Sequence, residues 1–282
     1  MNIIEQIIYY LSFDFVKYAI IAGIFISLCC AILGVTLVLK RYSMIGDGLS
    51  HVAFGAMAVA MVLSVTDIYI MLPATIIVAV LLLQLNKNSK VKSDSAIAMI
   101  SVSALAFGYF IINLFSGSAN VAGDVCTTLF GSTSILTLSN LDVWLCFILS
   151  ILVLCFFIYF HNKVFGVTFD ESFSKATGTN TALFNTIISV IIGIVIVLAM
   201  KLVGTLLISA LIVFPALSAI RIFKSYKMVV IFSCIISVIC TIIGLLMAIL
   251  FGTPVGATIV MVDLVAYFVC WLIEFAFKGA KA

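Results

Sequence analysis

The chain has 282 residues, of which 65% are hydrophobic and 9% are charged, and its net charge is +3. A soluble domain carries about 25% charged residues, so this composition cannot cover a water-facing surface and predicts that lipid surrounds most of the protein. The small net charge is spread over short loops, which argues against nucleic acid as a partner.

Apolar runs with few charges predict membrane-spanning helices, because about 20 apolar residues cross the hydrocarbon core as a helix. A short interfacial helix is expected first, at about residues 3–12, since its apolar side chains share one face. The runs that follow are residues 18–39, 43–65, 68–86, 95–115, 141–160, 176–200, 202–220, 228–250 and 256–273. We therefore expect an all-α polytopic membrane protein with eight or nine transmembrane helices in a single domain over residues 1–282.

The basic residues of the loops predict the orientation. If the N-terminus lies outside, all but Lys17 and Lys201 of the fourteen Lys and Arg residues fall in cytoplasmic segments. Cytoplasmic loops carry the excess of Lys and Arg in membrane proteins, so we expect an outer N-terminus and a cytoplasmic C-terminus. The basic-free stretch 116–140 is then an outer loop, in which we expect a short re-entrant helix.

Asp47 and His51 are the candidate site residues within the spans. Their spacing of four residues places them on one helical face, and an ionisable group inside a span is a functional hypothesis by default. Carboxylate and imidazole are suitable ligands for zinc or manganese, and a homodimer would double the two ligands to four. The alternative is that Asp47 caps its helix and His51 is a hydrogen-bonded interior residue.

Other polar features are weaker. The sequence FDESFSKATG at residues 169–178 is a charged island on the predicted cytoplasmic side, and it is either a docking segment for a soluble partner or an ordinary connector. Asp263 is a lone acid within the last span; it either lines the transport path or, as we expect, snorkels or pairs locally. The eight cysteines form no CxxC pair and are expected to pack as small apolar residues. No phosphate-binding GxxxxGK[ST] sequence is present, so another polypeptide would have to bind any ATP.

Several sequence blocks resemble one known family. RYSMIGDGLSHVAFGAMAVA at residues 41–60 resembles the signature of the bacterial zinc/manganese/iron ABC permeases. FDESFSKATG resembles the segment of that family which contacts the ATPase, and KLVGTLLISALIVFPALSAIR at residues 201–221 resembles its Gly-then-Pro membrane block. LFGSTSILTLSNLD at residues 129–142 and GTPVGATIV at residues 252–260 also resemble family segments.

The resemblance implies a homodimeric permease in the bacterial plasma membrane, with two cytoplasmic ATPase subunits and an extracytoplasmic metal-binding protein as partners. No cofactor would be permanently bound, and ATP hydrolysis would belong to the partner subunits. By motif position, Asp47 and His51 would line a transient site for the transported ion. The ATPase-coupling segment would cover about residues 163–181, and its candidate coupling residues are Phe169, Asp170, Glu171, Lys175 and Gly178.

Two departures from the family pattern bear on specificity. Residues 52–55 read VAFG where many members have Leu-Pro-Gly after the His, and this variant is associated with zinc uptake more than with manganese uptake. Zinc is therefore the first expectation, with manganese and iron as alternatives. Phe173 and Ser174 replace smaller or acidic residues, which could alter the fit to the ATPase.

An ion-coupled secondary transporter stays open as an alternative. An intramembrane metalloenzyme is less favoured because the sequence has no HExxH motif.

Overall fold

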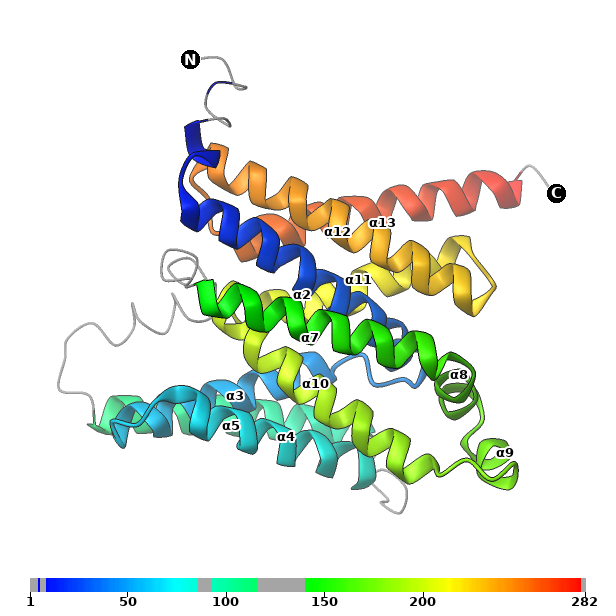
Figure 1. Ribbon diagram of the computed structural model, residues 1–282, viewed down its shortest axis with the longest axis horizontal. Coiled ribbons are helices and arrows are strands. Elements are labelled where there is room, and N and C mark those ends of the chain that lie inside the picture. The colour runs from blue at the N-terminus through cyan, green and yellow to red at the C-terminus, as the bar shows by residue number, and fades with distance from the viewer. Residues whose placement is uncertain (1–4, 6–8, 86–92, 116–139, 280–282) are drawn as a thin grey trace.

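The computed structural model describes residues 5, 9–85, 93–115 and 140–279, and these residues form helices and turns without a β-strand (Figure 1). The helices are α2 (Asp14–Leu39), α3 (Ile45–Val62), α4 (Asp67–Leu85), α5 (Ser93–Phe115), α7 (Asn140–Tyr159), α8 (His161–Phe169), α9 (Glu171–Ala176), α10 (Thr181–Val203), α11 (Thr205–Ile222), α12 (Tyr226–Phe251) and α13 (Val255–Gly279). The predicted all-α class is confirmed.

Eight of the described helices are long and apolar enough to cross a membrane, and α11 contributes a shorter apolar helix at Leu207–Ile222. This agrees with the expected eight or nine crossings. One boundary was wrong: residues 176–180, expected at the start of a span, form the end of α9 and the turn before α10. There Asn180 caps α10, since its Oδ1 accepts a hydrogen bond of 3.1 Å from Leu183 N. The predicted helix at residues 3–12 and the predicted re-entrant loop at residues 116–140 lie largely outside the described residues.

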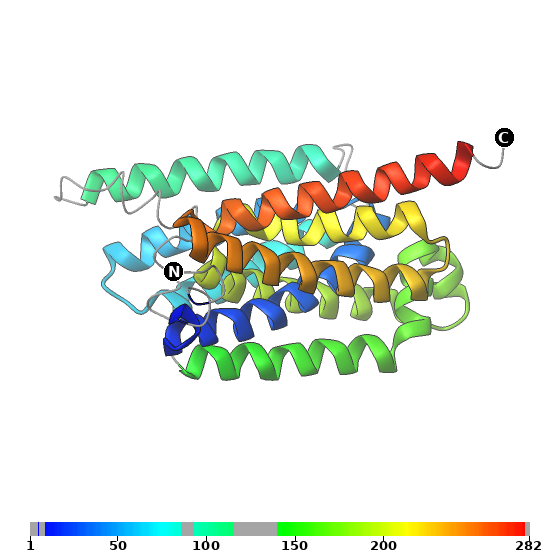
Figure 2. The same ribbon diagram turned by 90° about the horizontal axis from the view of Figure 1, so that it is seen from above.

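The long helices pack in two groups on either side of a central pair. Helices α3, α4 and α5 form one group, and α11, α12 and α13 form the other (Figure 1). Between them, α2 contacts α11, α12 and α7, while α10 contacts α4, α2 and α3. Seen from above, α7 lies along one side of the bundle and α5 and α13 along the opposite side (Figure 2). Helix α3, which carries Asp47 and His51, also packs directly on α11, so both α10 and α11 join its group to the rest of the protein.

The tightest helix contact joins α2 to α11. A Cβ added at Gly34 would overlap the carbonyl oxygen of Ile212 and lie 3.2 Å from the Ile212 Cα. Small residues let transmembrane backbones approach this closely, and the close approach supplies van der Waals contact that lipid cannot replace. Gly34 thus fixes the distance between the central helix α2 and the second helix group.

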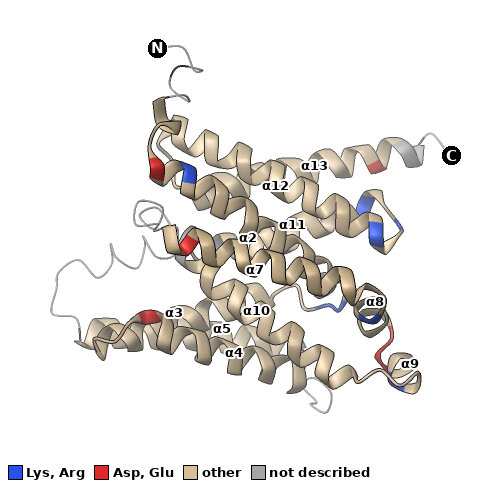
Figure 3. Ribbon diagram, viewed as in Figure 1, with Lys and Arg blue, Asp and Glu red and all other residues tan. Residues whose placement is uncertain are grey.

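Charged residues concentrate at the ends of the helices (Figure 3). Lys and Arg gather at the end of the bundle that carries α8, α9 and the connection between α11 and α12. Helix α2 begins at the opposite end of the bundle from the one where α13 ends (Figure 1). These Lys and Arg residues come from separate parts of the chain and gather at one end of the bundle. We call this end, with α8, α9 and the α11–α12 connection, the basic end.

Candidate functional site

Asp47 and His51 lie one above the other on α3 and contact each other. Asp47 Oδ1 is 3.4 Å from His51 Nε2, and their side chains are 28% and 12% exposed. A zinc ion bound at about 2.0–2.1 Å by two ligands of a tetrahedron requires those ligands to lie about 3.3 Å apart. The observed separation matches that edge length, so both side chains could bind one ion without rearrangement of the backbone.

Ser101 on α5 completes the surroundings of the carboxylate. Its Oγ donates a hydrogen bond of 3.1 Å to Asp47 Oδ2, and Ser101 is itself buried. This bond holds one carboxylate oxygen so that the other faces His51. The second ring nitrogen of His51, Nδ1, is buried and has no hydrogen-bond partner among the described residues. The sequence reasoning missed Ser101, because its separation of 54 residues from Asp47 carries no spacing signal.

The packing of α3 leaves the Asp47–His51 face as its partly open side. A Cβ at Gly48 would come within 2.7 Å of Ile97 Cγ2, and a Cβ at Gly55 within 2.9 Å of the Ala104 carbonyl oxygen. These contacts hold α3 firmly against α5. Asp47 does not cap α3 through its side chain, since no side-chain cap hydrogen bond is present at that N-terminus. The alternative interpretation of Asp47 as a helix cap is therefore not supported by the geometry.

Within the described residues, Asp47 and His51 are two potential ligands without a third beside them. No group of three or more His, Cys, Asp and Glu side chains with metal-binding geometry occurs in that part of the chain. A stable tetrahedral zinc site has four ligands, so these two side chains alone would hold an ion weakly.

The predicted coupling segment, at about residues 163–181, covers most of α8, all of α9 and the turn before α10 at the basic end. Two of its candidate residues lie at the ends of α9. Asp170 is the N-cap, with its Oδ1 accepting a hydrogen bond of 2.9 Å from Phe173 N. Gly178 ends the helix with a φ of +83°, while Thr179 N donates to Ser174 O at 3.0 Å. Asp170 and Gly178 therefore set the length of α9. The sequence analysis had proposed them as residues that couple to the ATPase.

The other candidate residues of this segment have different environments. Phe169 and Phe173 are each more than half exposed, and Lys175 is exposed in the last turn of α9. Glu171 points inward instead, and its Oε1 accepts a hydrogen bond of 3.3 Å from Asn185 Nδ2 on α10. The segment thus presents two aromatic rings and an ammonium group outward and one carboxylate toward the bundle.

An aromatic cluster attaches α8 to the start of α12. The Tyr226 ring lies 5.3 Å from the His161 ring and 5.3 Å from the Phe165 ring. Partial burial lowers the pKa of His161, and the positive charge of Lys227 lowers it further. The cluster therefore connects α8 to α12 of the second helix group.

Asp263 is buried between α13 and its neighbours. Its side chain is 1% exposed, and neither carboxylate oxygen has a hydrogen-bond partner among the described residues. Cys240 on α12 lies beside it. The structure does not bring Asp263 together with Asp47 and His51.

The described cysteines are all free, and those buried in the packing are Cys29, Cys30, Cys146, Cys240 and Cys270, while Cys126 lies outside the described residues.

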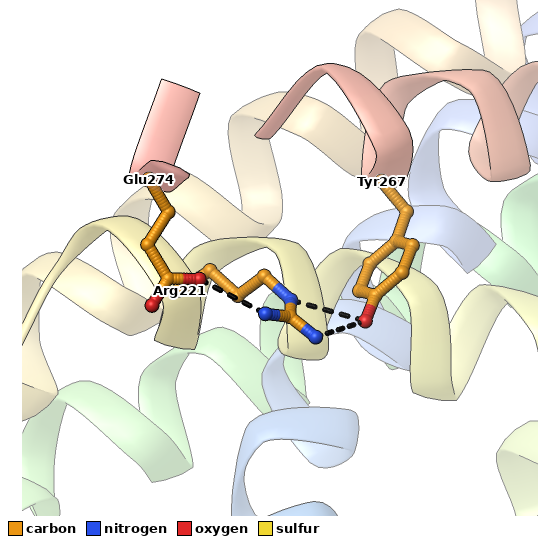
Figure 4. Close-up of polar contacts among 3 residues, drawn as sticks. All are labelled: Arg221, Tyr267 and Glu274. Carbon is orange, nitrogen blue, oxygen red and sulfur yellow. Dashed lines mark hydrogen bonds and ion pairs between the residues drawn. The ribbon is translucent and has the colours of Figure 1, made fainter. Parts of the chain in front are cut away.

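An ion pair ties α11 to α13 (Figure 4). Arg221 Nη1 is 2.9 Å from Glu274 Oε2, and Arg221 Nε donates a hydrogen bond of 3.0 Å to the Tyr267 hydroxyl. The guanidinium also lies over the Tyr267 ring, 5.0 Å from its centroid. Because Glu274 is only 19% exposed, this pair is better shielded than an ordinary surface ion pair. It closes the second helix group at the basic end.

A bundle with eight helices long and apolar enough to cross a membrane defines a multi-pass membrane protein. The chain belongs to the ABC 3 transport family, whose sequence model matches residues 12–274. The family resemblance inferred from the sequence blocks is confirmed, and membership makes the chain a transport permease subunit rather than an enzyme.

Named relatives extend over nearly the whole chain. The manganese import system permease protein ScaB of Streptococcus gordonii is 27% identical over 262 residues, which cover 93% of this chain and 92% of that protein. The high-affinity zinc uptake system membrane protein ZnuB of Haemophilus influenzae is 29% identical over 249 residues, covering 88% and 94%. The fold matches PsaBC from Streptococcus pneumoniae in complex with Fab with a TM-score of 0.84 and 26% identity, covering 99% of this chain and 100% of the matched chain.

Proposed function

We propose that this chain is the membrane-spanning subunit of an ATP-driven importer that carries a divalent metal ion into the bacterial cytoplasm. The observation that carries the proposal is the Asp47–His51 pair, whose ligand atoms lie 3.4 Å apart on the partly open face of a membrane helix. Family membership and the names of the zinc and manganese relatives support the metal as cargo. Zinc comes first in the proposal, with manganese and iron as alternatives.

The transport site is proposed to form between two copies of the chain. Two protomers that meet along the open face of α3 would supply two carboxylates and two imidazoles, which completes a tetrahedral ligand set. The site would release its ion when the ligands of the two copies move apart, as conduction requires. The partners are therefore a second copy of this chain, two cytoplasmic ATPase subunits and an extracytoplasmic metal-binding protein.

The proposed orientation places the basic end in the cytoplasm and the N-terminus outside. The gathering of Lys and Arg around α8, α9 and the α11–α12 connection supports it, since positive charge is retained on the cytoplasmic side. The exposed side chains of α9 then face the cytoplasm, where ATPase subunits would dock. ATP binding would move α9 and reorient the spans, so that the metal site opens alternately to each side.

The experiment is metal-resolved uptake by the reconstituted complex, with zinc and manganese compared for the wild type, Asp47→Ala and His51→Ala. Both variants should lose uptake of the cargo ion, while Asp94→Ala, which removes an exposed carboxylate from the first turn of α5, serves as the control. Undiminished transport by both site variants would overturn the proposed site. Metal uptake by this chain in vesicles without the ATPase subunits would favour an ion-coupled secondary transporter instead.

A further inference from the structure

A buried amide joins the coupling helix α9 to the end of α2. Asn185 on α10 is 5% exposed. Its Oδ1 accepts a hydrogen bond of 2.6 Å from Lys40 Nζ, and its Nδ2 donates one of 3.3 Å to Glu171 Oε1. The ammonium therefore meets the acceptor end of the amide and the carboxylate meets its donor end. The bond from Lys40 is short and charge-assisted, and the bond to Glu171 is long; together they set the orientation of the amide.

One end of this bridge lies on the coupling helix α9, and the other lies at the end of α2. Glu171 is the first residue of α9. Lys40 closes α2, and Arg41 ends the helix in the left-handed conformation, with a φ of +63°. Helix α3 then begins at Ile45, so Asp47 follows Lys40 by seven residues. An open pocket of about 340 Å³ lies beside the bridge, and its lining includes Lys40, Arg41, Glu171 and Asn185.

We propose that Asn185 is a positioning residue that couples movement of α9 to the start of α3, and so to the metal ligands, through its hydrogen bonds to Glu171 and Lys40. The inference rests on the proposed function, because it assigns a transmission path to the ATP-driven reorientation of the site. The bridge connects the predicted docking segment to the end of α2, and the short turn that follows Lys40 leads into α3, the helix that carries Asp47. It makes the α2–α3 connection, rather than α10 alone, the element that responds to the ATPase.

The chemistry of the bridge selects the test variants. Asn185→Leu removes both hydrogen bonds with little change in side-chain volume. Asn185→Asp keeps an acceptor for Lys40 but removes the donor to Glu171, and it places two carboxylates against each other. Asn113→Leu makes the same chemical change at an exposed amide of α5, which bonds only within its own helix to the Tyr109 carbonyl oxygen at 2.8 Å.

The measurement is ATP hydrolysis by the reconstituted complex, with and without the metal-loaded binding protein, together with metal uptake. Asn185→Leu should leave assembly and basal hydrolysis intact, while stimulation by the loaded binding protein and the metal transported per ATP fall about tenfold. Asn185→Asp should lose coupling in the same direction, and Asn113→Leu should match the wild type. A residue that only stabilised the fold would lower basal hydrolysis and assembly in parallel with the stimulation.

A second comparison tests the path itself. Lys40→Met should reduce coupling as Asn185→Leu does, and the double variant should be no worse than the more severe single variant, because both changes break one connection. Stimulation within about twofold of the wild type in assembled Asn185→Leu, or in Asn185→Asp if the Leu variant fails to assemble, would overturn the inference. Failure of the wild-type complex to take up zinc or manganese would instead overturn the proposed function.

Discussion

Replacing Ser101 by Ala tests whether the carboxylate of Asp47 is held in place for metal binding. Ser101 Oγ donates to Asp47 Oδ2 at 3.1 Å, from a buried position on α5. A hydrogen bond to a charged group contributes about 1.5–3 kcal/mol, and the partial exposure of Asp47 favours the lower end of that range. A loss of about 1.4 kcal/mol corresponds to a tenfold change in affinity. Loss of a partner that orients a metal ligand is known to weaken metal binding by about 10–100-fold.

The assay is equilibrium titration of the purified complex with zinc and with manganese, in competition with a chromophoric chelator. Ser101→Ala should raise the half-saturating metal concentration about tenfold, because the freed carboxylate must be ordered again on binding. Ser103→Ala removes an exposed hydroxyl from the same helix and should bind as the wild type does. Equal affinity of Ser101→Ala and the wild type, or an equal loss in Ser103→Ala, would refute the reasoning.

Three further outcomes concern the surrounding structure. Gly34→Ala should destabilise the fold by about 2 kcal/mol, because overlap with a neighbouring backbone outweighs the gain in helix propensity. Gly23→Ala meets only side-chain ends at 3.1 and 3.3 Å and should be near neutral, and thermal unfolding of the purified protein distinguishes the two variants. Arg221→Met should speed hydrogen exchange at the end of α13 more than Glu274→Gln does, since Gln retains an acceptor. Because the pKa of His161 is lowered in the folded protein, the unfolded chain takes up this proton at higher pH than the folded chain does. Stability therefore falls as the pH drops from about 7.5 to about 5.5, and His161→Gln should show a smaller drop in melting temperature over that range.

The spans and the contact between Asp47 and His51 were predictable because their signals are local. A charge-free run of about 20 residues reveals a crossing, and a spacing of four residues reveals a shared helical face. The wrong boundary at residues 176–180 has the same origin, since a turn without charges cannot be told from a span by charge alone. A local signal was present there, because Asn180 is a preferred capping residue just before an apolar run. The capping roles of Asp170 and Gly178 could have been recognised in the same way.

The partners of these residues were not predictable, because they come from distant parts of the chain. Ser101 reaches Asp47 only because α5 packs closely on α3, and Asn185 reaches Lys40 across 145 residues. A single sequence contains no periodicity that connects such positions, and serine and asparagine are ordinary residues within apolar helices. Helix packing determines which of these polar groups meet, so the three-dimensional structure was needed to find them.

The proposed division of the site between two copies fits the two ligands found within the described residues. A complete ligand cage within one chain would bind its ion whatever the distance between the two copies. Dividing the ligands between two copies makes affinity depend on the distance between them, since two ligands alone bind weakly. In the proposed transporter, that distance would respond to movement at the basic end, where Lys40 and Glu171 meet on Asn185. Metal affinity and ATP-driven movement would then both depend on the same short stretch of chain between the end of α2 and Asp47.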